Sequence, residues 1–286
     1  WGIGVMKGYQ PENLERATLL APSNAAYPLR LGWVCLEGDK LREARRWAHA
    51  ALRRDAESAE AHHLLGASWR REWLVNADLA TLDLSVLELA RSLRRNPGNA
   101  EAWLALVPLL VEQSEFEAAR DAAIAALRAA PHRPEALLAA AYTSQRMGDV
   151  ELAEGLFEHA IPRLAAERRK RFHDLEPVLF PSDAAAYEKL TPAERESYER
   201  RFWSDANPDL VSPVNEARLE FWTRAAHASF LYFNRVLKTW DQRGDLYVRF
   251  GAPGAMERNP RVMDRTPEWG DWMVWSYPSL GMSVWM

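Results

Sequence analysis

The sequence predicts a mainly α-helical protein: a solenoid of paired helices followed by a small α+β module with an antiparallel sheet. Residues 100–131 contain two stretches with apolar residues at helical spacing, separated by a short polar break. Pro97 and Pro131 lie 34 residues apart, and each ends a helical stretch because proline cannot continue a helix. After residue 270, by contrast, short apolar runs around a turn are typical of strands.

The helical pattern recurs at the same step on both sides of this stretch. Residues 134–165 follow the pattern of residues 100–131, with small residues at the same places in the second helix. Residues 25–56 form a further unit, and residues 13–22 fit the second helix of an earlier one. Several units in one register predict a repeat architecture, in which each helix pair completes its core by stacking on the next.

This region resembles the tetratricopeptide repeat family, whose period is about 34 residues. Leu31-Gly32 stands where the family has Leu-Gly in its first helix, and Ala44, Ala48 and Ala51 match its small positions in the second. The unit between positions 56 and 97 exceeds one period by seven residues, and the excess falls in residues 69–85. That excess predicts either a longer inter-helix loop or an extended first helix.

The chain is expected to consist of a solenoid (residues 1–166), a linker (167–189) and a C-terminal module (190–286). Charged residues at 167–171 and prolines at 177 and 181 mark the linker. Neither end has the pattern of a finished domain, so we expect the ordered portion of a longer protein, and the C-terminal module is expected to be truncated.

The C-terminal module begins with a strong helix start, because Thr191 can cap, Pro192 suits the first turn and Glu194 completes a capping box. We expect this helix to reach Trp203. A second helix is predicted from near Val214 through residue 236, followed by strands at 245–250, 271–277 and 282–286.

The module resembles the GWxTD domain, a family of bacterial proteins whose function is poorly defined. The matching segments are Phe202-Trp203, Arg243 to Tyr247, Phe250 to Pro253 with Glu257, and Trp275-Ser276-Tyr277. The motif that names the family is degraded, since Lys238 to Gln242 contains neither Gly-Trp nor Thr-Asp. The resemblance implies an α+β module, often fused to helical repeats and frequently exported. It brings no catalytic residues.

Composition excludes several classes of function. A formal net charge of -4 gives no support for a nucleic-acid surface. The single cysteine, Cys35, rules out an internal disulfide framework, and no histidine pair has the spacing of a zinc site. We therefore expect no metal and no cofactor. No apolar run is long enough to span a membrane, although membrane proximity through partners stays open.

The predicted binding residues lie in two places. In tetratricopeptide arrays the first helix of each repeat lines the concave groove, so the register places nine residues there: Trp33, Glu37, His63, Arg70, Arg71, Glu112, Tyr142, Gln145 and Arg146. Trp269 and Trp272 flank a loop-like stretch of the C-terminal module and are candidate interface anchors. The groove could instead be filled by the protein's own linker.

These features favour a protein–protein interaction scaffold or accessory subunit of a bacterial, envelope-associated or extracellular assembly, and not an enzyme. A hydrolase is the first alternative, with its site among four carboxylates of the C-terminal module: Asp241, Asp245, Glu257 and Asp264. A structural subunit that polymerises or coats through its Trp-rich face is the second. A periplasmic or extracellular location is implied only by the family resemblance.

Overall fold

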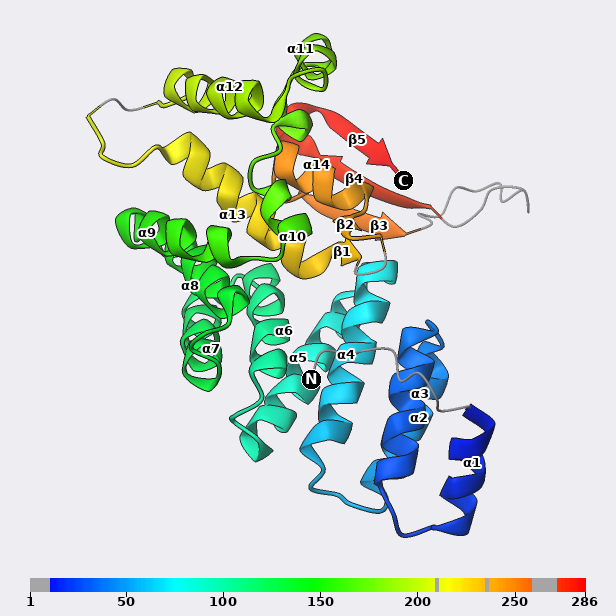
Figure 1. The fold of residues 1–286 in the computed structure, drawn as a ribbon. Coiled ribbons are helices and arrows are strands. Elements are labelled where there is room, and N and C mark those ends of the chain that lie inside the picture. Colours follow the sequence, from blue (N-terminus) through cyan, green and yellow to red (C-terminus); the bar gives the residue numbers. More distant parts are fainter. Residues whose placement is uncertain (1–10, 209–210, 235–236, 259–271) are drawn as a thin grey trace, which may run out of the picture. The chain divides into compact units, whose positions relative to one another are not determined.

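The computed structural model describes residues 11–208, 211–234, 237–258 and 272–286. Figure 1 shows helices over most of this part of the chain and a small sheet near the C-terminus. The chain divides into two compact units, unit 1 (Trp1–Leu109) and unit 2 (Leu110–Met286). The boundary falls inside helix α6 (Ala100–Glu112). The predicted fold class, an α-solenoid followed by an α+β module, is confirmed.

Unit 1 consists of paired helices. Its elements are α1 (Pro11–Leu20), α2 (Ala26–Glu37), α3 (Leu41–Leu52), α4 (Ala59–Asn76), α5 (Leu79–Arg95) and the start of α6. Ser58 and Asp78 cap α4 and α5 by accepting hydrogen bonds from backbone amides. The seven extra residues lengthen both helices and not the loop, because α4 runs for 18 residues and α5 for 17, with only positions 77 and 78 between them.

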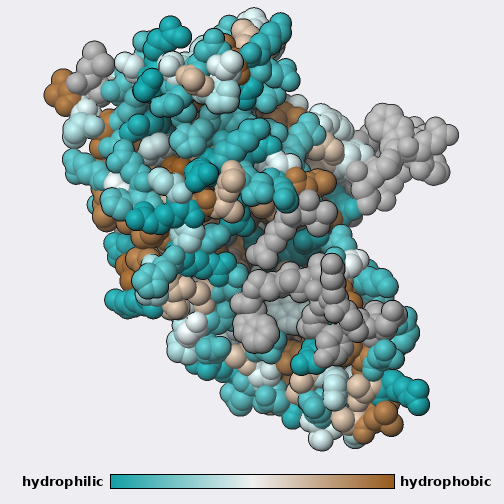
Figure 2. Space-filling view, viewed as in Figure 1, coloured by the Kyte–Doolittle hydropathy of each residue, from teal (hydrophilic) through white to brown (hydrophobic). Residues whose placement is uncertain are grey.

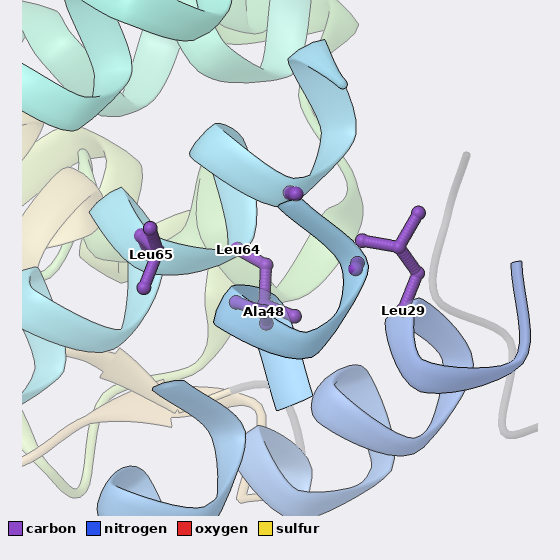
Figure 3. Close-up of a cluster of buried hydrophobic side chains, with 6 residues drawn as sticks. Leu29, Ala48, Leu64 and Leu65 are labelled. Atoms are coloured by element: carbon purple, nitrogen blue, oxygen red, sulfur yellow. The ribbon is translucent and has the colours of Figure 1, made fainter. Parts of the chain in front are cut away.

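Small residues let these helices approach closely. Leu29, Ala48, Leu64 and Leu65 meet in a buried cluster formed by α2, α3 and α4 (Figure 3). The same logic places Gly66 against α5, where a Cβ would lie 2.7 Å from Leu89 Cγ. The predicted Leu-Gly signature therefore marks positions where one helix backbone touches the next.

Gly66→Ala tests this close approach. The added methyl group would lie 3.1 Å from the backbone nitrogen of Leu89 as well as against its side chain, so helix α5 has to shift. We expect a loss of ~1–3 kcal/mol in the free energy of unfolding of unit 1. Urea denaturation followed by far-UV circular dichroism measures the change. Gly155→Ala, in a helix position with open space around it, is the matched control and should be neutral or slightly stabilising.

Unit 2 continues the helix pairs and adds the C-terminal module. Its helices are α7 (Phe116–Ala129), α8 (Pro134–Arg146), α9 (Val150–Ala160), η1 (Ile161–Arg163), α10 (Ala166–Arg171), η2 (Glu176–Val178), α11 (Pro181–Tyr187), α12 (Pro192–Asp205), α13 (Glu216–Leu231), α14 (Gln242–Phe250) and η3 (Pro278–Leu280). The capping box predicted at Thr191 is present, since Thr191 and Glu194 exchange both hydrogen bonds. The linker is not extended, because short helices occupy much of it.

The sheet of unit 2 is antiparallel. Strands β3 (Ala255–Arg258), β4 (Met273–Tyr277) and β5 (Met282–Trp285) lie in the order β3-β4-β5, with Trp275 paired to Met256 and Val284. A separate two-residue ladder joins β1 (Phe233–Asn234) to β2 (Thr239–Trp240). The strands predicted around the turn at 278–281 are therefore confirmed.

Two sequence predictions in this module are wrong. Residues 245–250 belong to helix α14 and not to a strand, because Asp241 caps a helix and the buried residues Gly244, Tyr247 and Val248 follow helical spacing. The apparent alternation of apolar residues was compatible with both periods. Helix α13 also ends at Leu231, where β1 soon follows, so it is shorter than predicted; residue 236 lies outside the described part of the chain.

The face of the molecule seen in Figure 2 is mostly hydrophilic. Figure 2 shows small apolar areas scattered over the visible face. The large apolar side chains that are most exposed are Leu19, Leu20, Leu79, Phe180, Val211 and Leu237. Within the described residues, no helix has the length and apolarity needed to cross a membrane.

Candidate functional site: the faces of the first helices

The predicted groove residues fall on two surfaces, one in each unit. We call the first the α2–α4 face; it comprises Trp33, Glu37, His63, Arg70 and Arg71. We call the second the α8 face; it comprises Glu112, at the end of α6, and Tyr142, Gln145 and Arg146 on α8. The two surfaces differ in what covers them.

Helix α13 of the C-terminal module packs on the α8 face. Tyr142 Oη lies 2.8 Å from His227 Nδ1, and Glu112 Oε1 lies 3.3 Å from His227 Nε2. One more contact is made two turns earlier on α13, where Gln145 donates a hydrogen bond to Glu220 at 3.1 Å. The α8 face therefore contacts a helix of the same chain at two points, which lie two turns apart on that helix.

Apolar contacts extend this interface onto α9. The ring of Trp222 lies 5.9 Å from that of Phe157, and its indole nitrogen donates to the backbone carbonyl of Phe172 at 3.2 Å. Arg218 pairs with Glu154 at 2.7 Å beside this contact. Because α13 is buried on nearly all sides, it is a core helix and not a loosely docked arm.

An aromatic stack closes the other side of His227. The imidazole lies parallel to the ring of Tyr247 on α14, with centroids 3.7 Å apart. Tyr232 packs at a tilt against both rings, with interplanar angles of 56° and 51°. His227 is fully buried between α8 and α14, so it joins the solenoid to the module and has no access to solvent.

Burial sets the charges of this cluster. It raises the pKa of Glu112 to about 7, against the attraction of Arg146. It also lowers the pKa of His227 well below the ordinary value, with Arg146 acting in the same direction. Both shifts favour the neutral forms, so a neutral carboxyl faces a neutral imidazole at pH 6.

The linker takes a smaller part in covering α8 than the sequence alternative supposed. Arg168 of α10 pairs with Glu135 at the start of α8, at 3.2 Å. The helix that lies along the predicted groove residues is α13. The linker instead contributes Phe172 and Leu175 to the core of unit 2.

The α2–α4 face collects side chains from three successive first helices. The rings of Trp33 and His63 meet edge to face, 5.2 Å apart. The amide of Asn99, just before α6, lies 3.3 Å from His63 Nδ1. Burial lowers the pKa of His63 to about 4, which the charge of Glu101 opposes and that of Arg70 reinforces. His63 is therefore neutral at physiological pH.

The far end of this face is more open. Glu37 is exposed, and the side chain of Arg71 is 53% exposed. Arg71 pairs with Asp39 at 3.1 Å, an exposed ion pair of a kind that stabilises by only ~0–1 kcal/mol. These side chains can therefore exchange partners at little cost.

The candidate anchors of the C-terminal module are only partly in view. Trp269 lies outside the described residues. Trp272 is half-buried and packs against Trp285, with ring centroids 4.5 Å apart, while Trp285 is 57% exposed. Trp272 and Trp285 thus form one aromatic pair at the end of strand β5.

The four carboxylates of the hydrolase alternative do not gather in a pocket of the described structure. Asp241 pairs with Arg243 at 2.6 Å, and Asp245 accepts a hydrogen bond from the indole of Trp240 at 2.6 Å. Glu257 is exposed on β3, and Asp264 lies outside the described residues. Burial raises the pKa of Asp245, which the Trp240 bond and Arg171 oppose.

Cys35 and His62, which the sequence offered as reactive or metal-binding groups, lie in surroundings typical of structural residues. Cys35 is half-buried, and burial raises the pKa of its thiol. His62 lies 2.6 Å from Glu88, which also pairs with Arg91. Over the described ranges, no three histidine, cysteine or acidic side chains are grouped as metal ligands.

Sequence reasoning missed the helix that fills the α8 face. Glu220 and His227 are two turns apart on α13, and each faces the groove residues. The available signal was the run Ala225 to Leu231, which holds no ionisable side chain except His227 and needs a second layer to cover it. Pattern alone could not say that the layer is the solenoid.

Stacked helix pairs followed by a small antiparallel sheet define a helical-repeat fold with an appended α+β module. No protein-family model matches the chain, and no characterised protein matches it in sequence. Similar solved structures include MamA, with 18% identity over 54% of this chain and 85% of that chain and a TM-score of 0.46.

Two other solved structures give similar values. A thermophilic tetratricopeptide-repeat protein of Thermus thermophilus has 18% identity, 54% and 80% coverage and a TM-score of 0.45. YrrB, a tetratricopeptide-repeat protein with an unusual peptide-binding site, has 21% identity, 54% and 75% coverage and a TM-score of 0.43. At these identities the likeness concerns the fold alone.

Proposed function

We propose that this protein is an interaction scaffold whose α2–α4 face binds a partner protein, while its α8 face is used within the chain. The observation that carries the proposal is the occupancy of the α8 face by α13. There, first-helix residues of the same chain contact a helix, through Tyr142, Gln145 and Glu112. The α2–α4 face offers an aromatic ring, Trp33, beside charged groups of both signs, a combination found at binding hot spots.

The C-terminal module has a second role in this proposal. It closes the solenoid by covering α8, as an end of a repeat array must be covered to stay soluble. The pair Trp272 and Trp285 supplies a further apolar surface. The resemblance of residues 190–286 to the GWxTD domain supports an accessory subunit of a bacterial, envelope-associated or extracellular assembly. Fractionation of producing cells tests that location, and a purely cytosolic protein would rule it out.

Site-specific photo-crosslinking tests the proposed surface directly. A photoreactive amino acid at position 33 should give one predominant crosslinked protein in cells that produce the chain. The matched control carries the same amino acid at position 94, an exposed arginine on the second helix α5. Equal products from both positions, or none from position 33, would contradict the proposal.

Arg71→Glu should weaken binding of the crosslinked partner, once purified, by at least about tenfold. The reason is that reversing a charge across an interface leaves an opposing charge desolvated and unpaired, which costs ~2–5 kcal/mol at buried positions. Isothermal titration calorimetry gives the affinity. Arg94→Glu is the control, and an equal effect of both substitutions would indicate long-range charge and not contact.

A further inference from the structure

The two faces are related by one displacement along the sequence. Adding 75 to a residue number converts the α2–α4 face into the α8 face: Glu37 corresponds to Glu112, Ala67 to Tyr142, Arg70 to Gln145 and Arg71 to Arg146. The displacement of 75 residues is the sum of one repeat of 34 residues and one of 41. Helices α4 and α8 begin at corresponding positions, and α2 and α6 end at them. The polar ends of the two faces therefore correspond, whereas Trp33 and His63 stand in the places of Pro108 and the buried Leu138.

The occupant of the α8 face shows what each position contacts. Glu220 accepts a hydrogen bond from Gln145. Burial lowers the pKa of Arg146, but Tyr142, Tyr247 and Glu220 act in the opposite direction and the pKa is raised. Two turns later, His227 faces Glu112 and Tyr142. A carboxylate therefore meets the end of α8, and an imidazole ring meets the end of α6.

The α2–α4 face keeps this chemistry and increases its charge. Arg71 stands in the place of Arg146, and Arg70 replaces the neutral Gln145. Glu37 stands in the place of Glu112, but it is exposed. Ala67 replaces Tyr142, so a ligand has more room at the centre of the face and loses one hydrogen bond to a phenol.

We propose that the α2–α4 face binds an amphipathic helix that presents a carboxylate to Arg70 and Arg71 and, two turns further on, a basic side chain to Glu37. This inference rests on the proposed function and names the chemistry of the partner. Charge complementarity supports it at both ends of the helix. Its apolar side chains pack against Trp33 and His63, which lie one to two turns before these charged residues on α2 and α4.

A peptide with the sequence of α13 provides the test, because it carries the required pattern. The probe is residues 214–232 with a fluorescent label, titrated with the full chain and followed by fluorescence anisotropy. In the full chain the α8 face is already filled by α13. Saturable binding is expected, and a scrambled peptide should not bind.

Charge exchange then locates the peptide on the face. Arg71→Glu should weaken binding at least about tenfold, and a peptide carrying Glu220→Lys should bind this variant better than it binds the wild type. Arg94→Glu should change neither affinity. Glu37→Ala in the chain combined with His227→Ala in the peptide should reduce the binding free energy by less than the sum of the two single effects. The reason is that each change removes the same contact.

Three results would overturn the inference: absence of binding to the wild type, binding that is insensitive to Arg71 and Glu37, or a crosslink of the peptide to α8 in place of the chain's own α13. The proposed function fails separately. If the peptide does not bind but the partner crosslinked at position 33 depends on Arg71, the scaffold stands and the helix inference falls. If the peptide binds and no partner is found, only the scaffold falls.

Discussion

Trp222→Ala should lower the free energy of unfolding of unit 2 by ~3–5 kcal/mol. Trp222 is only 6% exposed, packs on Phe157 and donates a hydrogen bond to the carbonyl of Phe172. Its removal leaves a cavity and an unsatisfied carbonyl where α13 meets α9 and the linker. Urea denaturation followed by far-UV circular dichroism measures the loss.

Trp285→Ala is the matched control for this prediction. The same side chain is removed, but Trp285 is 57% exposed, so the cost should stay below ~1 kcal/mol. Native-state hydrogen exchange should place the loss caused by Trp222→Ala in α8, α9 and α13, with α2 to α5 unchanged. Equal effects of the two substitutions would mean that α13 is not the core helix of unit 2.

Glu112→Gln should lose stability relative to the wild type as the pH falls. The pKa of Glu112 is about 7 in the folded protein and 4.5 as the ordinary value, so the folded state binds the extra proton between these pH values. Proton uptake by the folded state stabilises it as pH falls, by about 3 kcal/mol in total at ~1.4 kcal/mol per pH unit. Glutamine cannot take up this proton.

His227 acts in the opposite direction. Its folded pKa is lowered well below 6.5, so the unfolded state takes up the proton first and stability is lost as pH falls below 6.5. In the wild type the gain from Glu112 opposes the loss from His227 between about pH 4.5 and 6.5. In Glu112→Gln the loss begins at 6.5.

The difference between variant and wild type isolates the titration of Glu112 from that of His227, which both proteins keep. The charged and titratable groups that face them are Arg146, Glu220, Tyr142, Tyr232 and Tyr247, and both proteins share them. Urea denaturation at pH steps from 8 to 4 should show a gap that widens by about 3 kcal/mol as pH falls. A constant gap would mean that Glu112 is ionised in the folded protein at neutral pH.

The solenoid could be predicted from the sequence because its signals are local. Pro97 and Pro131 give the period, and small residues such as Gly66 mark where helices touch. Helix α14 could not be predicted in the same way, since Leu246, Val248 and Phe250 alternate as a strand would. Its helix is decided by Asp241, which caps it, and by Tyr247, which stacks on His227 of another helix.

The candidate site was predictable only as a set of positions. The repeat register places Tyr142 and Arg70 on corresponding faces, but it says nothing of what covers each one. Whether a face is filled depends on contacts between segments far apart in the sequence, such as Tyr142 with His227, 85 positions later. That information lies in the packing of α13, whose residues carry no repeat signal of their own.

The central claim is that a partner binds the α2–α4 face while the α8 face stays filled by α13. Hydrogen–deuterium exchange of the full chain, with and without the partner crosslinked at position 33, tests it most directly. We expect slower amide exchange in α2 and α4 when the partner is bound, and unchanged exchange in α8 and α13. Protection confined to α8, or faster exchange in α13 when the partner binds, would contradict it.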